Sequence, residues 1–418
     1  MDGKSKNVKL FPKYRQISRD FLFFYTINVL FLTQIKKIDI SSVVLIDTFY
    51  ALFVVLMQVP GTWIVEKIGR RKGMILGNIF NCLYLITVIN STNLINLICA
   101  ELMSSFAFSL KDIAEPAILN ESIELEKEEK SKKFAKIQGQ AISGYYVLSA
   151  ISMILSGFLF EINGYIPMYL SFIIVVITLI MSTRFTEPMD FVKEDETAEE
   201  LSLKETIKFA AKSRRCRCIL IFSAIFFAII SVLATYEISL LEELKIESKY
   251  IGIIFAALNV VSAIGSRKHI SFQNKFKNRT LTVLGILLAS SIMISGFAAT
   301  LNVSTYIVLS IIILMYIIKY VVVGLYNVLL IKYLSNFTNS QIDTKIFAIN
   351  SFCASVTSAF AGIFASKLIE QSNTAEAMII FGAFSAIALT ITLLYMKNRF
   401  GLEPSKYSEL EVKYDSKV

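Results

Sequence analysis

The stretch VPGTWIVEKIGRRKG, Val59–Gly73, places a cluster of charge between two long apolar runs. Its segment Glu66–Lys72 holds one acid and four bases within seven residues. Apolar runs of about 20 residues recur along the whole chain, and a helix of that length spans a hydrocarbon layer of roughly 30 Å. The stretch therefore predicts a short charged loop between two membrane-spanning helices.

The composition of the whole chain is that of a membrane protein. Of its 418 residues, 55% are hydrophobic and only 18% are charged, and the mean hydropathy is +0.61. Soluble domains carry about 25% charged residues. We therefore expect an all-α integral membrane protein with twelve transmembrane helices. The predicted spans are 20–35, 41–65, 73–90, 93–116, 136–159, 163–183, 217–241, 250–266, 280–300, 305–331, 346–367 and 375–396.

The distribution of Lys and Arg predicts the orientation. With the N-terminus in the cytoplasm, inner segments contain 35 of the 42 Lys and Arg residues and outer loops contain 5. Cytoplasmic loops carry such an excess, so both termini are predicted to be cytoplasmic in a multi-pass protein of the cell membrane. This excess also explains the net charge of +9 without a nucleic-acid partner. No cleavable signal peptide is visible, and the short first span leaves an upstream extension open.

The longest polar segment divides the chain into two halves of six spans each. Two pseudo-symmetric six-helix bundles are typical of secondary transporters, whose binding site lies near the midplane where the halves meet. We predict an N-terminal bundle over 1–183, a cytoplasmic linker over 184–216, a C-terminal bundle over 217–396 and a cytoplasmic tail over 397–418.

The later part of the linker has the pattern of an amphipathic helix on the inner leaflet. A disordered linker is the alternative. The apolar residues at helical spacing are Leu201, Leu203, Ile207 and Ala210, and the lysines beside them are Lys204, Lys208 and Lys212.

Several functional classes lose support from what the sequence lacks. The five cysteines show no extracellular pairing pattern, and with a single histidine we expect no metal site. No nucleotide-binding loop, DDxxD pair or HExxH motif is found, which argues against an ATP-driven pump or a membrane enzyme. We expect a monomer that needs no cofactor other than a coupling proton and whose partners are the lipid bilayer and a small-molecule substrate.

The charged loop resembles the signature of the major facilitator superfamily, which reads G-x-L-A-D-R-x-G-R-R. Pro60 precedes the match, as in a bacterial or archaeal efflux-like subgroup with an E-x-P-x-G lead-in. Thr62 stands where a glycine belongs, Val65 replaces a small residue and glutamate replaces aspartate. The residues on the D-R-x-G-R-R part are Glu66, Lys67, Gly69, Arg70 and Arg71.

Further similarity to this family covers most of the chain, including Thr186–Pro188 at the end of the first half. The resemblance implies alternating access of two rocking bundles. It also implies that the loop acid, Glu66, contacts neighbouring bases and the N-terminal end of the eleventh helix, which holds an outward-open state. An acid is favoured near arginines and at a helix N-terminus. The alternative is a plain basic loop that only sets topology.

Acidic residues within the spans are candidates for proton coupling. Each ionisable group there costs on the order of 3 kcal/mol on insertion scales and needs a partner, water or a function. Counted along straight helices, Asp47, Glu101 and Glu237 lie in the outer half of the bilayer. A partly desolvated carboxylate can take up a proton near neutral pH. Interhelical hydrogen bonding is the alternative for each of them.

Lys319 is the lone cation of its span. The same counting places it about 20 Å from the outer surface and some 14 Å from Glu237 along the normal, too far for an easy ion pair. It could attract an anionic substrate or neutralise a carboxylate in the cavity. Lys111 and Glu115, four residues apart, are predicted to form a structural pair.

The resemblance implies that helices 1, 4, 7 and 10 line a central cavity. The polar and aromatic residues that these helices would offer to a substrate are Asn28, Glu101, Tyr236, Lys319, Tyr320, Tyr326 and Asn327.

The sequence thus favours a secondary transporter that exports amphipathic compounds by proton antiport. The fifth span has glycines but lacks the proline of the motif that drug-proton antiporters often carry there, which leaves a divergent exporter or a different coupling open. One alternative is a proton symporter importing a small organic anion, for which Lys319 is the argument. Another is a membrane sensor that transports nothing.

Overall fold

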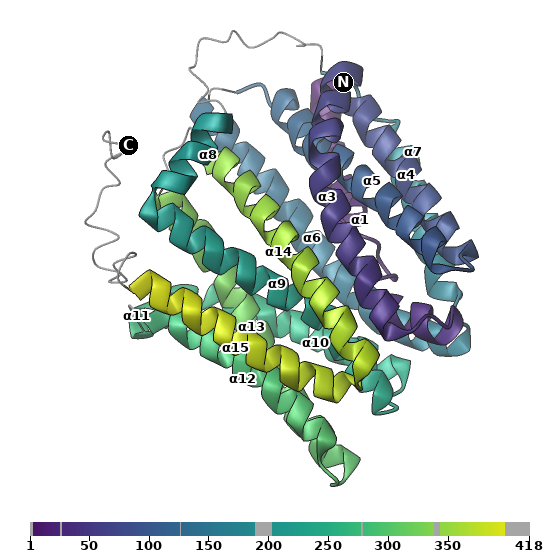
Figure 1. The fold of residues 1–418 in the computed structure, drawn as a ribbon. Coiled ribbons are helices and arrows are strands. Elements are labelled where there is room, and N and C mark those ends of the chain that lie inside the picture. Colours follow the sequence, from purple (N-terminus) through teal and green to yellow (C-terminus); the bar gives the residue numbers. More distant parts are fainter. Residues whose placement is uncertain are drawn as a thin grey trace. The chain divides into compact units, whose positions relative to one another are not determined.

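The computed structural model describes residues 3–25, 27–125, 127–188, 203–276, 279–337 and 343–397, and these are almost entirely helical (Figure 1). Within these ranges ten helices are long and apolar enough to cross a membrane, and α7 (Ile166–Ser182) is apolar but shorter. The ten are α3 (Ile40–Ile68), α4 (Arg70–Asn90), α5 (Leu94–Ser122), α6 (Lys127–Ile162), α9 (Arg214–Glu243), α10 (Ser248–Arg267), α12 (Thr280–Thr300), α13 (Thr305–Phe337), α14 (Asp343–Gln371) and α15 (Thr374–Lys397).

Eleven of the twelve predicted spans correspond to these helices, and the first is different. The prediction of one helix over 20–35 is wrong, because a helix begins upstream and is interrupted. α1 (Gly3–Ser18) is followed by a non-helical stretch, then by one turn of α-helix, α2 (Asn28–Leu30), and by a π-helical turn, η1 (Phe31–Ile35). We refer to α1, the break, α2 and η1 together as helix 1.

Contacts divide the chain into two compact units. Unit 1 comprises residues 1–194 and 246–256, and unit 2 comprises 195–245 and 257–418. Residues 189–202 of the predicted linker and the tail from residue 398 lie outside the described residues. Ile246–Ala256 belongs with unit 1 because the first turns of α10 pack closely on α6. A Cβ atom on Gly252 would lie 2.4 Å from the Met153 carbonyl oxygen, so only glycine permits this approach.

Unit 1 is built around α5, which packs on α3 and α4. α1 lies against α5, α6 and α7, and α7 also packs on α4. The buried apolar residues at this meeting of helices include Phe11, Met74, Leu110, Ile118 and Phe185. These contacts fix the last turns of α1 against the middle of α5, where the polar network described below is located.

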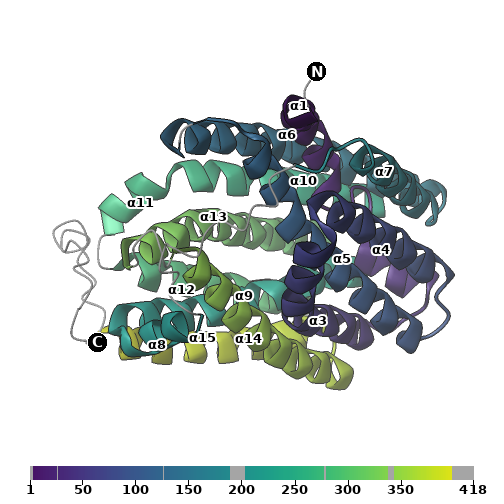
Figure 2. The same cartoon turned by 90° about the horizontal axis from the view of Figure 1, so that it is seen from above.

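In unit 2, α9 packs on α14 and α15, and α12 packs on α13 and α15, as can be followed in Figure 2. Two shorter helices complete the unit, α8 (Leu203–Lys212) and α11 (His269–Phe276). α8 is the predicted amphipathic helix, with Ala210 buried and Lys208 and Lys212 exposed, and it contacts α9 and α14. Its placement on the inner leaflet remains a prediction.

Candidate functional site

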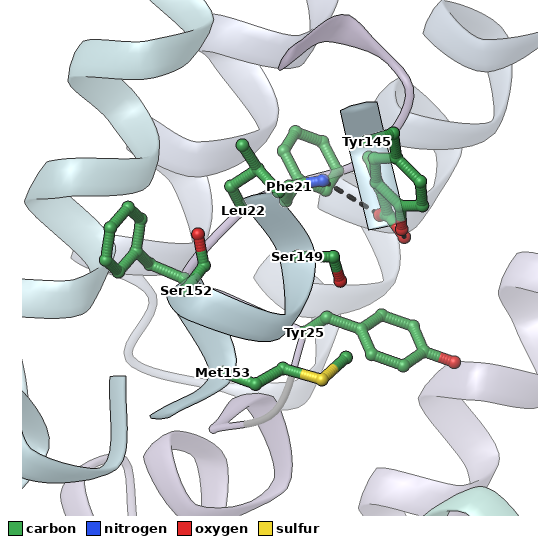
Figure 3. A pocket seen from close by; sticks show the side chains of 9 residues that line it. Phe21, Leu22, Tyr25, Tyr145, Ser149, Ser152 and Met153 are labelled. Carbon is green, nitrogen blue, oxygen red and sulfur yellow. Dashed lines mark hydrogen bonds between the residues drawn. The ribbon is translucent and has the colours of Figure 1, made fainter. Parts of the chain in front are cut away.

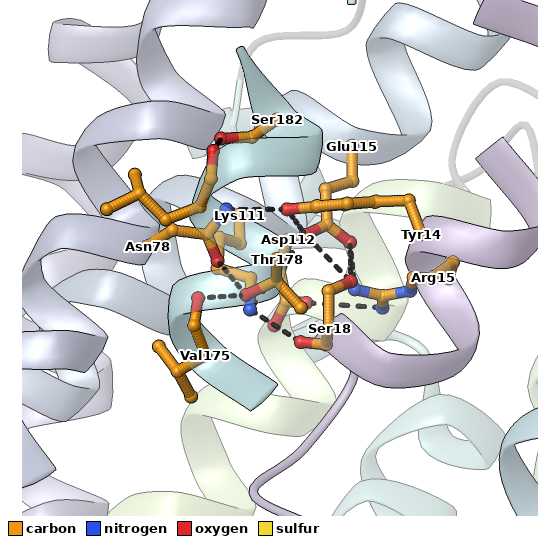
Figure 4. A network of polar contacts seen from close by, with 11 residues as sticks. Tyr14, Arg15, Ser18, Asn78, Lys111, Asp112, Glu115, Val175, Thr178 and Ser182 are labelled. Atoms are coloured by element: carbon orange, nitrogen blue, oxygen red, sulfur yellow. Dashed lines mark hydrogen bonds and ion pairs between the residues drawn. The ribbon is translucent and has the colours of Figure 1, made fainter. Parts of the chain in front are cut away.

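Glu115 is the centre of a buried polar network in unit 1 (Figure 4). Its side chain is fully buried on α5 and binds three groups from the last turns of α1. Arg15 forms an ion pair with it, and Tyr14 and Ser18 donate hydrogen bonds to it over 2.9 Å and 3.3 Å. Asn78 of α4 donates in turn to the Tyr14 hydroxyl at 2.9 Å. A basic residue expected in the cytoplasmic tail is therefore part of the helix packing.

The charges of this network balance one another. Lys111 Nζ lies 4.0 Å from Glu115 Oε1, as the spacing of four residues predicted, and it also donates to the Ser18 carbonyl oxygen. Arg15 reaches Asp112 at 3.5 Å. Two cations thus face two carboxylates, which is the condition under which buried charge is tolerated.

Glu101 lies on α5, 9% exposed, among aromatic rings. Tyr84 of α4 donates a hydrogen bond to Glu101 Oε1 over 3.3 Å, and the Tyr84 ring stacks on Phe21 at 4.9 Å. Asp47 of α3 is half-buried and close enough for its charge to act on Glu101. The structure therefore brings two of the three predicted coupling residues together in unit 1.

The third predicted coupling residue forms a buried ion pair in unit 2. Lys319 Nζ lies 3.0 Å from Glu237 Oε2, and both side chains are less than 5% exposed. The predicted separation of these residues is wrong. α13 has 33 residues, or about 50 Å at 1.5 Å per residue, so it exceeds the bilayer and depth cannot be counted from its first residue. The Tyr320 ring lies 4.3 Å from the same Lys319 ammonium group.

The other predicted cavity residues have different surroundings. Tyr236 is fully buried and donates to the Ala365 carbonyl oxygen over 2.6 Å, which joins α9 to α14. Tyr326 is also fully buried, in contact with Phe226. Asn327 is exposed on α13, and Asn28 is half-buried at the start of α2. Burial leaves the two tyrosines suited to packing, whereas the two asparagines are more accessible.

The charged stretch that was predicted as a loop is helical except at Gly69, where α3 ends and α4 begins, and it contacts the end of the first half of the chain. Glu187 accepts hydrogen bonds from the backbone N–H groups of Arg70 and Arg71, at 2.6 Å and 2.9 Å, and so caps α4. Arg70 Nε also pairs with Glu121 at 3.0 Å, and Arg71 donates to the Thr183 carbonyl oxygen. A carboxylate at a helix N-terminus is stabilising.

Glu66 itself is exposed and forms no ion pair with any residue that the structure describes, so the expected contact with neighbouring bases is absent there. The bases are engaged elsewhere, since the side chain of Lys67 lies over the Trp63 ring at 4.9 Å. The acid that lies at the N-terminus of α4 is instead Glu187, from the end of the first half of the chain. The gating role of Glu66, Lys67, Gly69, Arg70 and Arg71 remains a prediction.

We predict that Gly69→Ala destabilises unit 1. Gly69 separates α3 from α4 with φ of +95°, and a Cβ atom there would lie 2.9 Å from the Glu187 carboxylate. With ψ of 162°, this backbone conformation is adopted almost only by glycine and costs a residue with a side chain about 1–3 kcal/mol, and the clash adds to this cost. Thermal unfolding of the purified protein should show a lower Tm for Gly69→Ala than for Gly139→Ala, whose Cβ meets no atom within 4 Å. Equal Tm values would contradict the prediction.

Two charged residues of the break in helix 1 were missed by the sequence analysis. Arg19 and Asp20 stand at the edge of the first predicted span, where charge needs no explanation. The signal was the length of that span, since its 16 residues reach only about 24 Å. Any upstream extension moves both residues into the membrane.

The family of this chain is shown by comparison with known proteins. A family model described as Major Facilitator Superfamily matches residues 19–342. The chain belongs to this superfamily. No curated protein matches the sequence. The fold and the family together identify a multi-pass membrane transporter of the secondary type.

Solved transporters share this fold at low sequence identity. A mutant of the nucleoside transporter NupG has a TM-score of 0.74 and 12% identity, covering 94% of this chain and 100% of that one. A bacterial homolog of the human lysosomal transporter Spinster has a TM-score of 0.73 and 13% identity, with coverages of 96% and 98%. A D-xylose-proton symporter has a TM-score of 0.70 and 11% identity, covering 93% of this chain and 97% of that one. These similarities establish the major facilitator fold of the chain.

Proposed function

We propose that this superfamily member exports amphipathic small molecules in exchange for protons by alternating access. The observation that carries the proposal is the site of Glu101. It is a desolvated carboxyl group with one hydrogen bond from Tyr84 and a second acid, Asp47, close by. Two neighbouring carboxylates repel when both are ionised, so a site of this kind favours holding a proton.

The surroundings of Glu101 also suit a carboxyl group that holds a proton. The rings of Phe21, Phe24 and Tyr84 contact one another in unit 1, and Phe21 contacts Phe108. The first three of these rings are buried, so they keep water away from the carboxyl group of Glu101. Removal of water disfavours the charged form of a carboxyl group.

The structure gives the competing hypothesis less support. Import of an organic anion rested on Lys319 as an unpaired cation, and Glu237 matches its charge at 3.0 Å. A neutralised ion pair has little attraction left for an anion.

Dye movement in everted membrane vesicles tests the proposal. Wild-type vesicles should accumulate a lipophilic dye under an imposed pH gradient, and a proton uncoupler should abolish the accumulation. Glu101→Gln should reduce dye uptake to the level of vesicles without the protein at equal expression, because glutamine cannot exchange a proton. Glu376→Gln, the same change at an exposed acid of α15, is the matched control. If wild-type vesicles move no dye in either direction, the proposal is wrong.

A further inference from the structure

The interruption of helix 1 is stabilised by hydrogen bonds from neighbouring helices of unit 1. Ser156 of α6 donates a hydrogen bond to the Phe23 carbonyl oxygen over 2.8 Å, and Ser171 of α7 donates to that of Leu22 over 2.5 Å. Lys111 of α5 donates to the last carbonyl oxygen of α1, that of Ser18. Three neighbouring helices therefore satisfy backbone groups that an intact helix would satisfy itself. Inside a membrane such compensation is what permits a non-helical backbone.

The break lies well within the spans that surround it. Ser149 is central in the apolar part of α6, Lys136–Ile162, and lines the break. Phe21 contacts Phe108, which is central in α5, at 5.4 Å. Phe23 has φ of +69°, a left-handed conformation that costs a bulky residue about 1–3 kcal/mol. Strain kept at this depth by three sets of hydrogen bonds points to a binding function.

Asp20 brings a negative charge into the break without an ion pair. Its Oδ1 accepts the Phe21 N–H at 2.8 Å, which is the dashed line drawn from Phe21 in Figure 3, and its Oδ2 accepts the Tyr145 hydroxyl at 3.1 Å. Among the described residues, no Lys or Arg nitrogen lies within 4.0 Å of this carboxylate. Both bonds come from neutral donors, so they orient the carboxylate and leave its charge unmatched.

The nearby cations have other partners. Arg19 stacks its guanidinium over the Tyr145 ring at 5.1 Å and over the Tyr146 ring at 5.9 Å. Lys111 belongs to the balanced network around Glu115. The charge of Asp20 is therefore offset only at a distance, by Lys111 and by Arg19, and neither cation lies beside the carboxylate.

A small pocket adjoins the carboxylate. Figure 3 shows Tyr25, Tyr145, Ser149 and Met153 around it. The volume in which the centre of a water molecule can lie is about 10 Å³, roughly what a single water-sized group requires. Asp20, Tyr145 and Ser149 are among the residues that line the space, and each carries a side-chain oxygen atom. Oxygen is the donor atom that hard cations select.

We propose that the break in helix 1 binds a sodium ion, with the Asp20 carboxylate as the charged ligand and the Tyr145 and Ser149 hydroxyl oxygens beside it. One carboxylate matches a single positive charge, which favours a monovalent ion over calcium or magnesium. The C-terminal end of α1 adds its partial negative charge to the site, as half-helices do in other transporters with discontinuous helices. This site is separate from Glu101 and goes beyond the proposed proton exchange.

Thermal unfolding of the full-length protein in detergent tests the sodium site without a transported substrate. At constant ionic strength, replacing choline chloride with 100 mM sodium chloride should raise Tm by about 3 °C or more, with saturation, and potassium chloride should not. Asp20→Asn should abolish the sodium-dependent rise. Asp112→Asn, the same change at a mostly exposed acid of the same unit, should retain it.

A second variant, Ser149→Ala, tests the site if Asp20→Asn does not fold. Ser149→Ala removes one neutral ligand, so it should raise the half-saturating sodium concentration about tenfold. An equal Tm rise in sodium, potassium and choline would overturn the site, as would no rise in any salt. A sodium-dependent rise that survives both substitutions would also overturn it. A failure of dye export leaves this result unaffected, because no transport is measured.

Discussion

Replacing Glu115 with glutamine is expected to destabilise unit 1 strongly. The substitution leaves Arg15 and Lys111 buried without the carboxylate that neutralises them, and only the largely exposed Asp112 remains near Arg15. Removing one partner of a buried ion pair costs about 3–5 kcal/mol, a large share of the roughly 5–15 kcal/mol that stabilises a typical domain. We expect a fall in Tm of about 6 °C or more in thermal unfolding of the detergent-solubilised protein.

Two further variants separate charge from packing in this network. Asp112→Asn removes a carboxylate that is 64% exposed and should change stability by less than about 1 kcal/mol. Adding Lys111→Met to Glu115→Gln removes one unmatched cation and should recover part of the lost Tm. A Tm of Glu115→Gln within 2 °C of the wild-type value would show that the network does not carry this energy.

The span pattern could be predicted from the sequence because it depends on local hydropathy. Apolar runs and the distribution of Lys and Arg fixed eleven spans, and the linker pattern predicted α8. The break in helix 1 could not be predicted in the same way. Its backbone groups are satisfied by Lys111, Ser156 and Ser171, which lie roughly 90 to 150 residues away in the sequence. Each of these residues is ordinary when taken alone.

The partners of the charged residues also could not be predicted from the sequence. Arg15 appeared to belong to a basic tail, and only the extension of helix 1 upstream brings it to Glu115. Glu101 was recognised as a candidate from its place in an apolar run, but its partner Tyr84 comes from a different helix. Sequence therefore identified the charges that lie within apolar runs but not Arg15, Arg19 and Asp20, and the pairing of all of them depended on helix lengths and offsets between helices.

The ion pair between Glu237 and Lys319 makes the second large prediction. Lys319→Met should leave an uncompensated carboxylate and Glu237→Gln an uncompensated ammonium group, each side chain being less than 5% exposed. Each single variant is expected to lose about 3–5 kcal/mol, measured as a lower Tm and a lower yield of monodisperse protein. The double variant, with both charges removed, should regain most of that loss, since neutral replacements of a buried pair are often tolerated.

This double-mutant cycle also tests the role of Lys319. If the lysine serves only to match Glu237, the double variant should be stable and should still accumulate dye in everted vesicles. If the lysine is an anion-binding group, Lys319→Met should leave Tm near the wild-type value and abolish uptake of labelled organic anions. The 3.0 Å separation and the burial of both side chains favour the first outcome. A Lys319→Met single variant as stable as the wild type would show that Lys319 is not what neutralises Glu237.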